Sequence, residues 1–243
     1  MTAYGKFALI YDSLMRDVDY DAWAEYICGF LTPGCSVLEC SCGTGEISVR
    51  LARKGYALVS TDISEDMLKI ASEKARKNRT RIVFARMDMR ELYSHKPVDA
   101  VIAVCDGVNY LLTEDDLRRF FKSARDVLKP SGQLLFDVSS EYKLRTELGD
   151  NTIASDEGDV AFIWQNSYDE ARHTVDMELS FFVRHGELYE KFEETHIQKG
   201  HDADELIRLL NECGFEVTGA YDAFTRDCIK HDSERIQLVA RRI

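Results

Sequence analysis

The segment at residues 37–48, "VLECSCGTGEIS", holds two glycines, two cysteines and two glutamates. Three kinds of chemistry suit such a composition: metal binding by thiolates, thiol–disulfide exchange, and binding of a ligand against exposed backbone. Cys40 and Cys42 have no second Cys or His pair at zinc-ligand spacing, which argues against a metal site. They also lack the C-x-x-C spacing of redox pairs, so thiol exchange remains a lesser alternative.

The flanking residues favour the third possibility. "CSVLECS" reads as a short apolar strand, and "GEISVRLARKGY" reads as a helix that Gly55 ends. Gly43 and Gly45 therefore lie on a strand-to-helix turn, where glycine permits unusual dihedral angles and close approach of a ligand. The following helix start offers free N–H groups and a positive dipole end.

A second strand, "YALVSTD", ends in Asp62, which follows Gly43 by 19 residues. A carboxylate at the end of this strand can accept both hydroxyls of a ribose. Asp62 could instead cap the next helix, "SEDMLKIASEKARKN", but Ser64 already stands at the N-cap position, with acidic residues in the first turn. Ribose binding is therefore the preferred role.

Strands and helices continue to alternate. "TRIVFARMD" predicts a third strand ending at Asp88, "PVDAVIAVCDG" a fourth ending at Cys105 and Asp106, and "QLLFDVSS" a fifth. The amphipathic helix between the last two is expected to stop at Pro130 and Gly132. Such alternation predicts an α/β fold, a Rossmann-like doubly wound and mostly parallel sheet whose ligand crevice lies at the carboxyl ends of the strands.

Residues 150–198 break this rhythm. Three strand-like runs, "DVAFIWQNSY", "TVDMELSFFV" and "ELYEKFEETHI", with a turn at "RHGE", predict a small antiparallel β insertion. A helix, "DADELIRLLNECGF", and two closing strands, "FEVTGAYDA" and "RIQLVARRI", follow. We therefore expect a core of residues 1–149 and 199–243, and an insertion that serves as a lid or acceptor-site cover.

Charge and composition limit the partners. Lys and Arg number 31 against 43 Asp and Glu, a formal charge of −12, which disfavours double-stranded nucleic acid and anionic membrane. The N-terminus lacks the pattern of a secretory leader and no long apolar run occurs, so a cytoplasmic protein is expected. The seven cysteines are odd in number, and we expect reduced, buried thiols.

At this point the chain resembles class I S-adenosylmethionine-dependent methyltransferases over nearly its whole length. "LECSCGTGE" resembles their first motif, and Asp62, "MDM" at 87–89 and "VCDGVNYL" at 104–111 match the later ones. "YGKFALIYD" and "YEKFEETHIQKGHDADELIRLLNECGF" resemble the small-molecule, N-methyltransferase-like branch. The resemblance implies a seven-stranded sheet with an antiparallel last strand and a helical N-terminal cap. One departure is Ser41, where the family often has glycine.

The resemblance implies S-adenosylmethionine as cofactor and a role for each matched residue. Gly43 and Gly45 would pass its methionine end over bare backbone, Glu39 would accept from its amino group, and Asp62 would hold its ribose. The remaining implied cofactor contacts are Ile63 and Met67 on the adenine, Asp88 on its amine, the Met89 N–H on a ring nitrogen, Cys105 and Asp106 beside the methionyl and methyl groups, and Tyr11 over the sulfonium. Ile63 and Met67 could equally be core, and Asp88 could cap "MRELY".

Methyl transfer from a sulfonium requires alignment and exclusion of water more than an enzyme nucleophile. A general base is needed only if the acceptor must first lose a proton. Weak candidates near the acceptor are Asp106, Tyr110 and Tyr11, with His173, His185 and His196 expected at solvated or edge positions of the insertion. An amine acceptor would suit the insertion's glutamates, although a solvated strand face explains them equally well: Glu187, Glu190, Glu193 and Glu194.

Other functions stay open from sequence. The N-P-P-Y and Pro-Cys signatures of DNA methylation are absent, which favours a small-molecule acceptor. An NAD-dependent oxidoreductase would share the glycine turn and Asp62, although Ser48 stands where G-x-G-x-x-G requires glycine. A non-catalytic S-adenosylmethionine-binding protein would use the same residues. No metal is expected, and the sequence does not decide between monomer and homodimer.

Overall fold

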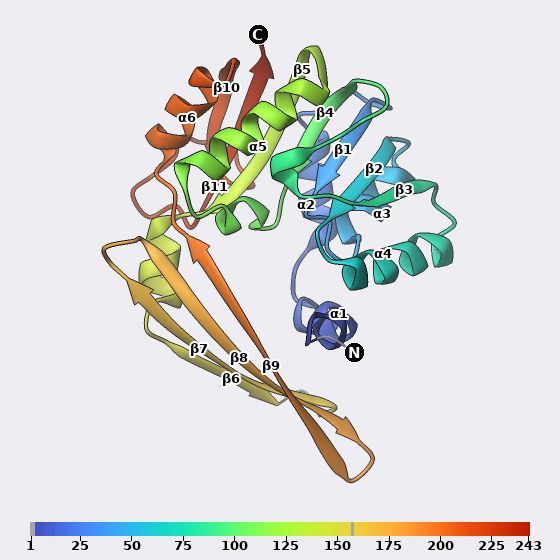
Figure 1. Cartoon of the computed structure of the whole chain (residues 1–243), viewed down its shortest axis with the longest axis vertical. Coiled ribbons are helices and arrows are strands. Elements are labelled where there is room, and N and C mark those ends of the chain that lie inside the picture. The colour runs from blue at the N-terminus through green and yellow to red at the C-terminus, as the bar shows by residue number, and fades with distance from the viewer. Residues whose placement is uncertain (1–2, 157) are drawn as a thin grey trace.

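A computed structural model describes residues 3–156 and 158–243 of the chain. A seven-stranded sheet flanked by helices forms the core, and a separate four-stranded sheet extends from it (Figure 1). The larger sheet has the strand order β10-β11-β5-β4-β1-β2-β3. Its strands are β1 Ser36–Cys40, β2 Ala57–Asp62, β3 Ile82–Arg86, β4 Val98–Ala103, β5 Leu128–Ser139, β10 Phe215–Asp222 and β11 Arg235–Arg242.

Strands β1 to β5 pair in parallel, whereas β11 pairs antiparallel with both β5 and β10. The predicted doubly wound sheet with an antiparallel last strand is thereby confirmed. The central strand β1 is buried from Val37 to Cys40, as expected for a parallel strand covered on both faces. The carboxyl ends of β1, β2 and β4 therefore meet at one edge of the sheet, where the glycine turn also lies.

Helices cover both faces of this sheet. The bounds are α1 Ala3–Leu14, α2 Tyr20–Cys28, α3 Glu46–Arg53, α4 Glu65–Lys77, α5 Glu114–Val127 and α6 Ala203–Glu212. Leu117, Phe120 and Phe121 of α5 pack with α6 against one face of the sheet, while α2 and α3 pack against the other. The side chain of Ser64 accepts from the N–H of Met67, which confirms its predicted place as the N-cap of α4.

Some boundaries differ from the prediction. Helix α5 ends at Val127, before Pro130, because Leu128 is already extended and pairs with Val98. Strands β3 and β4 stop short of Asp88 and Cys105, since a short 3₁₀ turn follows each strand: η1 Met89–Glu91 and η2 Gly107–Tyr110. The residues expected at strand ends therefore lie on the connections just beyond them.

The insertion forms an antiparallel sheet in the order β6-β7-β8-β9. Its strands are β6 Thr152–Asp156, β7 Val160–Asp169, β8 Thr174–His185 and β9 Leu188–Lys199. The hairpin at "RHGE" joins β8 to β9. The sequence predicted three strands; β6 was missed because "TIASD" has no alternation of large apolar residues, and the preceding π-helical turn, η3 Lys143–Leu148, was also missed.

A third apolar cluster joins the insertion to the core. Phe7 and Ile10 of α1 and Met67 of α4 pack against β8, whose buried residues are Val175, Met177, Leu179 and Phe181. Figure 1 shows α1 lying between the core and the long β7–β9 ribbon. Helix α1 is therefore positioned to link the two sheets at the ligand edge.

Two further observations concern the cysteines and the helices. All seven cysteines are free, but only Cys40 and Cys213 are buried. Cys228, on the loop between β10 and β11, is exposed and the other four are partly buried, so the expectation of buried thiols holds for two of the seven. Within the described residues, no helix is both long and apolar enough to span a membrane.

Candidate functional site

The glycine turn is held in left-handed conformations. Ser41, Gly43 and Gly45 have φ values of 49°, 53° and 80°, a region that favours glycine. A Cβ atom on Gly43 would meet nothing within 4 Å, whereas one on Gly45 would lie 3.0 Å from the Cβ of Ala71 on α4. Gly43 thus leaves backbone open to a ligand, and Gly45 is required for close packing of the turn on α4.

The geometry explains the departure at Ser41. Its left-handed backbone is a conformation in which glycine is favoured, and its hydroxyl donates to the Cys40 carbonyl at 2.7 Å. The side chain faces Gly107, where a Cβ atom would lie 2.0 Å from the Ser41 hydroxyl oxygen. Gly107 therefore provides the space that Ser41 occupies.

Asp62 is tied to the turn. Its Oδ2 accepts from the N–H of Gly43 at 2.8 Å, and its Oδ1 accepts from the N–H of Ser64 at 2.9 Å. Burial raises the pKa of Asp62 above its ordinary value. A carboxylate has about four acceptor positions, so capacity remains for ligand hydroxyls. The neighbouring Ile63 is 58% exposed and offers an apolar surface beside this carboxylate.

Glu39 lies beneath the turn and is fully buried. Its Oε2 accepts from the hydroxyls of Ser48 and Ser60, the latter at 2.7 Å. Burial raises the pKa of Glu39 to about 7, even though both hydroxyl bonds favour its ionised form. The carboxyl group is thus poised between its two protonation states near neutral pH.

The other three residues predicted to contact the adenine lie in different environments. Met67 is buried in the cluster with α1 and β8, so the core alternative describes its packing. Asp88 caps η1, accepting from the Arg90 N–H at 2.9 Å, and pairs with the Arg90 guanidinium at 2.6 Å, which lowers the pKa of Asp88. Met89 is partly buried against the core. The implied adenine roles of these three residues stay predictions.

Beyond β4, Cys105 and Asp106 both have left-handed backbones, with φ values of 63° and 66°. Their N–H groups donate to the carboxylate of Asp137 at 3.1 and 3.2 Å. Arg235 pairs with Asp106 at 2.6 Å and with Asp137 at 2.5 Å, and lies over the ring of Trp23 at 4.9 Å. This buried network fixes an otherwise strained loop at the ligand edge.

The same network limits the ability of Asp106 to accept a proton. Burial alone would raise the pKa of Asp106, but Arg235 lowers it below its usual range. With its carboxylate paired to Arg235 and accepting from the Ser139 hydroxyl at 2.7 Å, Asp106 is poorly suited to be a general base. The sequence did not identify Asp137 or Arg235, although an acid within the apolar run "QLLFDVSS" was a visible signal.

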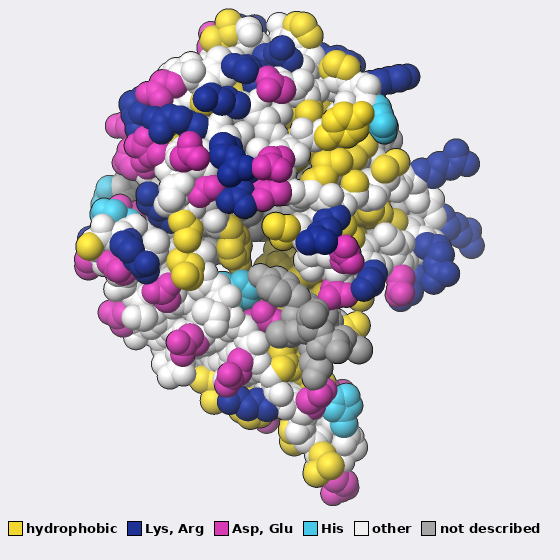
Figure 2. Space-filling model, in the orientation of Figure 1, with side chains coloured by type: hydrophobic (Ala, Val, Ile, Leu, Met, Phe, Trp, Pro, Cys, Tyr) yellow, Lys and Arg dark blue, Asp and Glu magenta, His cyan; other side chains and the backbone are white. Residues whose placement is uncertain are grey.

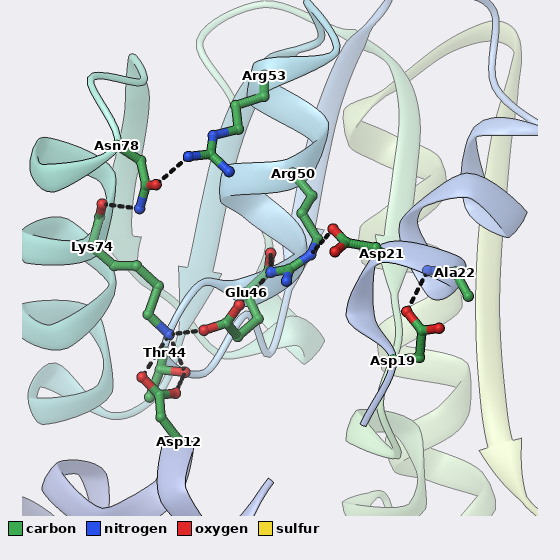
Figure 3. A network of polar contacts seen from close by, with 10 residues as sticks. All are labelled: Asp12, Asp19, Asp21, Ala22, Thr44, Glu46, Arg50, Arg53, Lys74 and Asn78. Carbon is green, nitrogen blue, oxygen red and sulfur yellow. Dashed lines mark hydrogen bonds and ion pairs between the residues drawn. The ribbon is translucent and has the colours of Figure 1, made fainter. Parts of the chain in front are cut away.

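The N-terminal helix α1 is fastened to the glycine turn (Figure 3). Asp12 accepts from the Thr44 hydroxyl at 2.5 Å and pairs with Lys74 of α4 at 2.7 Å. Lys74 in turn pairs with Glu46, at the start of α3. Tyr11, directly before Asp12, is thereby held over the same edge of the sheet.

Aromatic side chains from three elements gather above this edge. Burial raises the pKa of Tyr11 well above its ordinary value, and so does the proximity of Tyr20, Cys105, Tyr110 and Asp106. The hydroxyl of Tyr110 lies 3.3 Å from Nδ1 of His196 on β9, and the ring of His196 lies 5.5 Å from that of Phe7. Tyr11 therefore remains a neutral phenol, and burial lowers the pKa of His196.

The other two histidines that the sequence offered as candidates lie elsewhere. His173 is half exposed and pairs with Glu141 at 3.0 Å, while His185 is at the hairpin tip beside Glu190. These match the solvated positions expected for them. Among the described residues, no group of three or more potential ligands is arranged to hold a metal ion.

A pocket of about 740 Å³ opens between α2 and the loop joining β10 to β11. Trp23, Lys143, Lys230 and Arg235 are among its lining residues, and none of the predicted site residues lines it. Because Arg235 also pairs with Asp106, this pocket shares one wall with the network at the ligand edge.

Comparison with known proteins decides the family. A profile described as a methyltransferase domain matches residues 37–132. The methyltransferase-family protein YqeM of Bacillus subtilis (strain 168) is 39% identical over 240 residues, which cover 98% of this chain and 97% of the relative. The chain belongs to the class I S-adenosylmethionine-dependent methyltransferases. The NAD-dependent oxidoreductase alternative is thereby set aside.

Solved structures of methyltransferases have the same fold as this chain. A S-adenosylmethionine-dependent methyltransferase from Clostridium acetobutylicum ATCC 824 superposes with a TM-score of 0.87 at 31% identity, covering 98% of both chains. The sugar N-methyltransferase KedS8 from Streptoalloteichus sp ATCC 53650 superposes with a TM-score of 0.77 at 20% identity, covering 96% of this chain and 92% of that one. This methyltransferase therefore shares its whole architecture, insertion included, with enzymes of the family.

The cofactor, S-adenosylmethionine, fits the residues at the ligand edge. Gly43 offers open backbone, and Asp62 has remaining acceptor capacity beside the exposed Ile63. The N-cap of α3 is Gly45, which has no side chain to occupy the first N–H groups of the helix. When bound, the cofactor supplies an electrophilic methyl group. The residues of the turn would hold it, and α1 would help to exclude water from it.

Proposed function

We propose that this methyltransferase acts on a small-molecule acceptor, at nitrogen or oxygen, bound beneath a roof formed by α1, η2 and β9. The observation that carries the proposal is the closure of this roof. Helix α1 contacts both α4 and β9, and β9 contacts η2, while Asp12 fastens α1 to the glycine turn. Figure 2 shows a hollow between the core and the insertion. A site covered in this way suits a small acceptor better than a nucleic-acid duplex.

Three further features support a small acceptor. The formal charge of −12 opposes binding of polyanions. The cluster of Tyr11, Tyr110 and His196 offers polar and aromatic contacts at the scale of one small molecule. KedS8, which shares the architecture, is described as a sugar N-methyltransferase. We expect the protein to act in the cytoplasm as a monomer or homodimer, with residues 150–198 serving as the acceptor-site cover.

The experiment is a transfer assay with methyl-labelled S-adenosylmethionine and a Bacillus subtilis extract divided by dialysis into small-molecule and macromolecular fractions. We expect label to appear in the small-molecule fraction, with formation of S-adenosylhomocysteine. Heat-inactivated protein serves as the control. Label confined to the protein or nucleic-acid fraction would contradict the proposal.

A further inference from the structure

The four-stranded sheet turns one face toward α1 and the core. Strand register aligns side chains across this inner face: Trp164, Leu179 and Glu194 form one row. Asn166, Met177 and His196 form the next row, closer to the core. Because Met177 and Leu179 are buried against α1, the polar members of both rows point into the same enclosed region.

Glu194 is the exceptional member of this face. Its exposed fraction is 5%, and its Oε1 atom has no hydrogen-bond partner among the described residues. Burial raises the pKa of Glu194, and no charged side chain among the described residues acts on its carboxylate. Trp164 Nε1 and Asn166 Oδ1 on the same face also lack partners among the described residues. Burying a carboxylate without compensation is costly, so this arrangement calls for a partner that the chain itself does not provide.

The other glutamates of the insertion behave differently. Glu187, Glu190 and Glu193 are all exposed. Glu190 lies 3.4 Å from His185, and Glu193 lies 2.5 Å from Lys191. The solvated-face explanation therefore accounts for these three, and Glu194 alone is directed inward.

We propose that the inner face of the insertion binds an amine, whose N–H groups donate to the Glu194 carboxylate, and that this amine is the methyl acceptor. The inference rests on the proposed function and narrows it to nitrogen. A carboxylate without a donor favours a basic group and repels an anionic one. Leu179 and Met177 would contact the carbon skeleton of the amine, and Trp164 and Asn166 have polar atoms available for its other substituents.

The reaction balances without another reactant. The nitrogen lone pair forms the new N–CH₃ bond, the sulfonium sulfur keeps the electron pair of the broken C–S bond, and one proton leaves the nitrogen for solvent. An amine that arrives protonated must lose a further proton before it reacts. Glu194 serves here to bind and orient the amine nitrogen.

The chemical test uses the small-molecule fraction of the extract, treated before the transfer assay. Acylation of that fraction with acetic anhydride in water blocks amines, and we expect it to abolish methyl acceptance. Acceptance that survives acylation would overturn the inference while leaving the proposed function intact. An absence of label from the untreated fraction would instead remove the proposed function, and the inference with it.

The residue test compares Glu194→Gln with the exposed neighbour Glu193→Gln. Loss of a hydrogen bond to a charged group is worth about 1.5 to 3 kcal/mol, so we expect the KM for the acceptor fraction to rise about tenfold or more in Glu194→Gln. The affinity for S-adenosylmethionine, measured by calorimetry, should not change, and Glu193→Gln should behave as the wild type. An unchanged KM in Glu194→Gln would overturn the assignment.

A third measurement needs no substrate. Glu194→Leu removes a buried carboxylate without a partner, so we expect its denaturation midpoint to rise above that of the wild type. A lowered midpoint would show that Glu194 serves the fold, and would overturn the inference. Cofactor affinity again reports that the core of the variant is intact.

Discussion

Buried polar groups at the ligand edge of the core have partners within the described part of the chain, whereas several of those on the insertion do not. In the core, Glu39 is bonded to two hydroxyls, and Arg235 joins Asp106 to Asp137. On the insertion, Glu194, Trp164 and Asn166 keep polar atoms without partners among the described residues. Among the described side chains, the strands of the seven-stranded sheet have no such atom, and the core exception is His201, between β9 and α6, whose two ring nitrogens also lack partners. The carboxylates at the ligand edge of the core thus have partners within the chain, whereas we propose that an acceptor supplies the partner of Glu194.

The largest expected effect comes from removing Arg235, the cation of the core network. Arg235→Met leaves the buried carboxylate of Asp137 and the partly buried one of Asp106 without their cation, and we expect the free energy of unfolding to fall by about 3 to 5 kcal/mol. Arg241→Met is the control, because its pair with Glu216 is half exposed and should be worth at most about 1 kcal/mol. Urea denaturation measures both. Equal, small losses would show that the core network does not hold the fold.

A pH series tests the second core carboxyl, Glu39. Its folded pKa of about 7 lies above the unfolded value of about 4.3. The folded state therefore binds the proton more tightly, and this contribution is full below pH 4.3 and lost as pH rises through 7. Relative to Glu39→Gln, the wild type should lose about 3 kcal/mol between pH 4 and 8.

The control for that series is Glu216→Gln, which replaces a half-exposed carboxylate outside the ligand edge. Parallel stability curves for wild type and Glu39→Gln would contradict the raised pKa. Denaturant titrations at each pH give the required free energies.

Substitution of the two glycines of the turn separates a packing role, expected for Gly45, from a ligand-contact role, expected for Gly43. Gly45→Ala should cost about 2 kcal/mol of stability, since it adds both a strained backbone and a contact with Ala71. Gly43→Ala should cost about 1 kcal/mol, because only the backbone term applies. Cofactor affinity, measured by calorimetry, should be weakened more by Gly43→Ala, whose Cβ enters the open side. The reverse ranking of the two effects would contradict this division of roles.

The sequence predicted the parts of the site that local pattern determines. Gly43 lies on the turn from β1 to α3, and Asp62 and Ser64 lie on the turn from β2 to α4, so each placement follows from a local strand, turn and helix-start pattern. The ion pair of Arg235 with Asp137 could not be found this way, because 98 residues separate the partners and only strand register brings them together. The contact of Tyr110 with His196 spans 86 residues and depends on the packing of η2 against β9.

Glu194 is an intermediate case. The alternation of Val175, Met177, Leu179 and Phe181 predicted one buried face for the middle strand. Applying the same period of two to "KFEETHIQK" would have put Phe192, Glu194 and His196 on one face and Glu193 on the other. Which face was buried depended on the hairpin register, which only the structure supplied.

The most direct test of the account is calorimetric titration of the protein with S-adenosylmethionine and S-adenosylhomocysteine, repeated on Asp62→Asn. The amide keeps one acceptor oxygen, which cannot serve Gly43, Ser64 and a ribose together. We predict binding of both compounds to the wild type, at least about tenfold weaker binding to Asp62→Asn, and wild-type affinity in Glu65→Gln, an exposed carboxylate in the next helical turn. Wild-type affinity in Asp62→Asn would contradict the placement of the cofactor against the glycine turn.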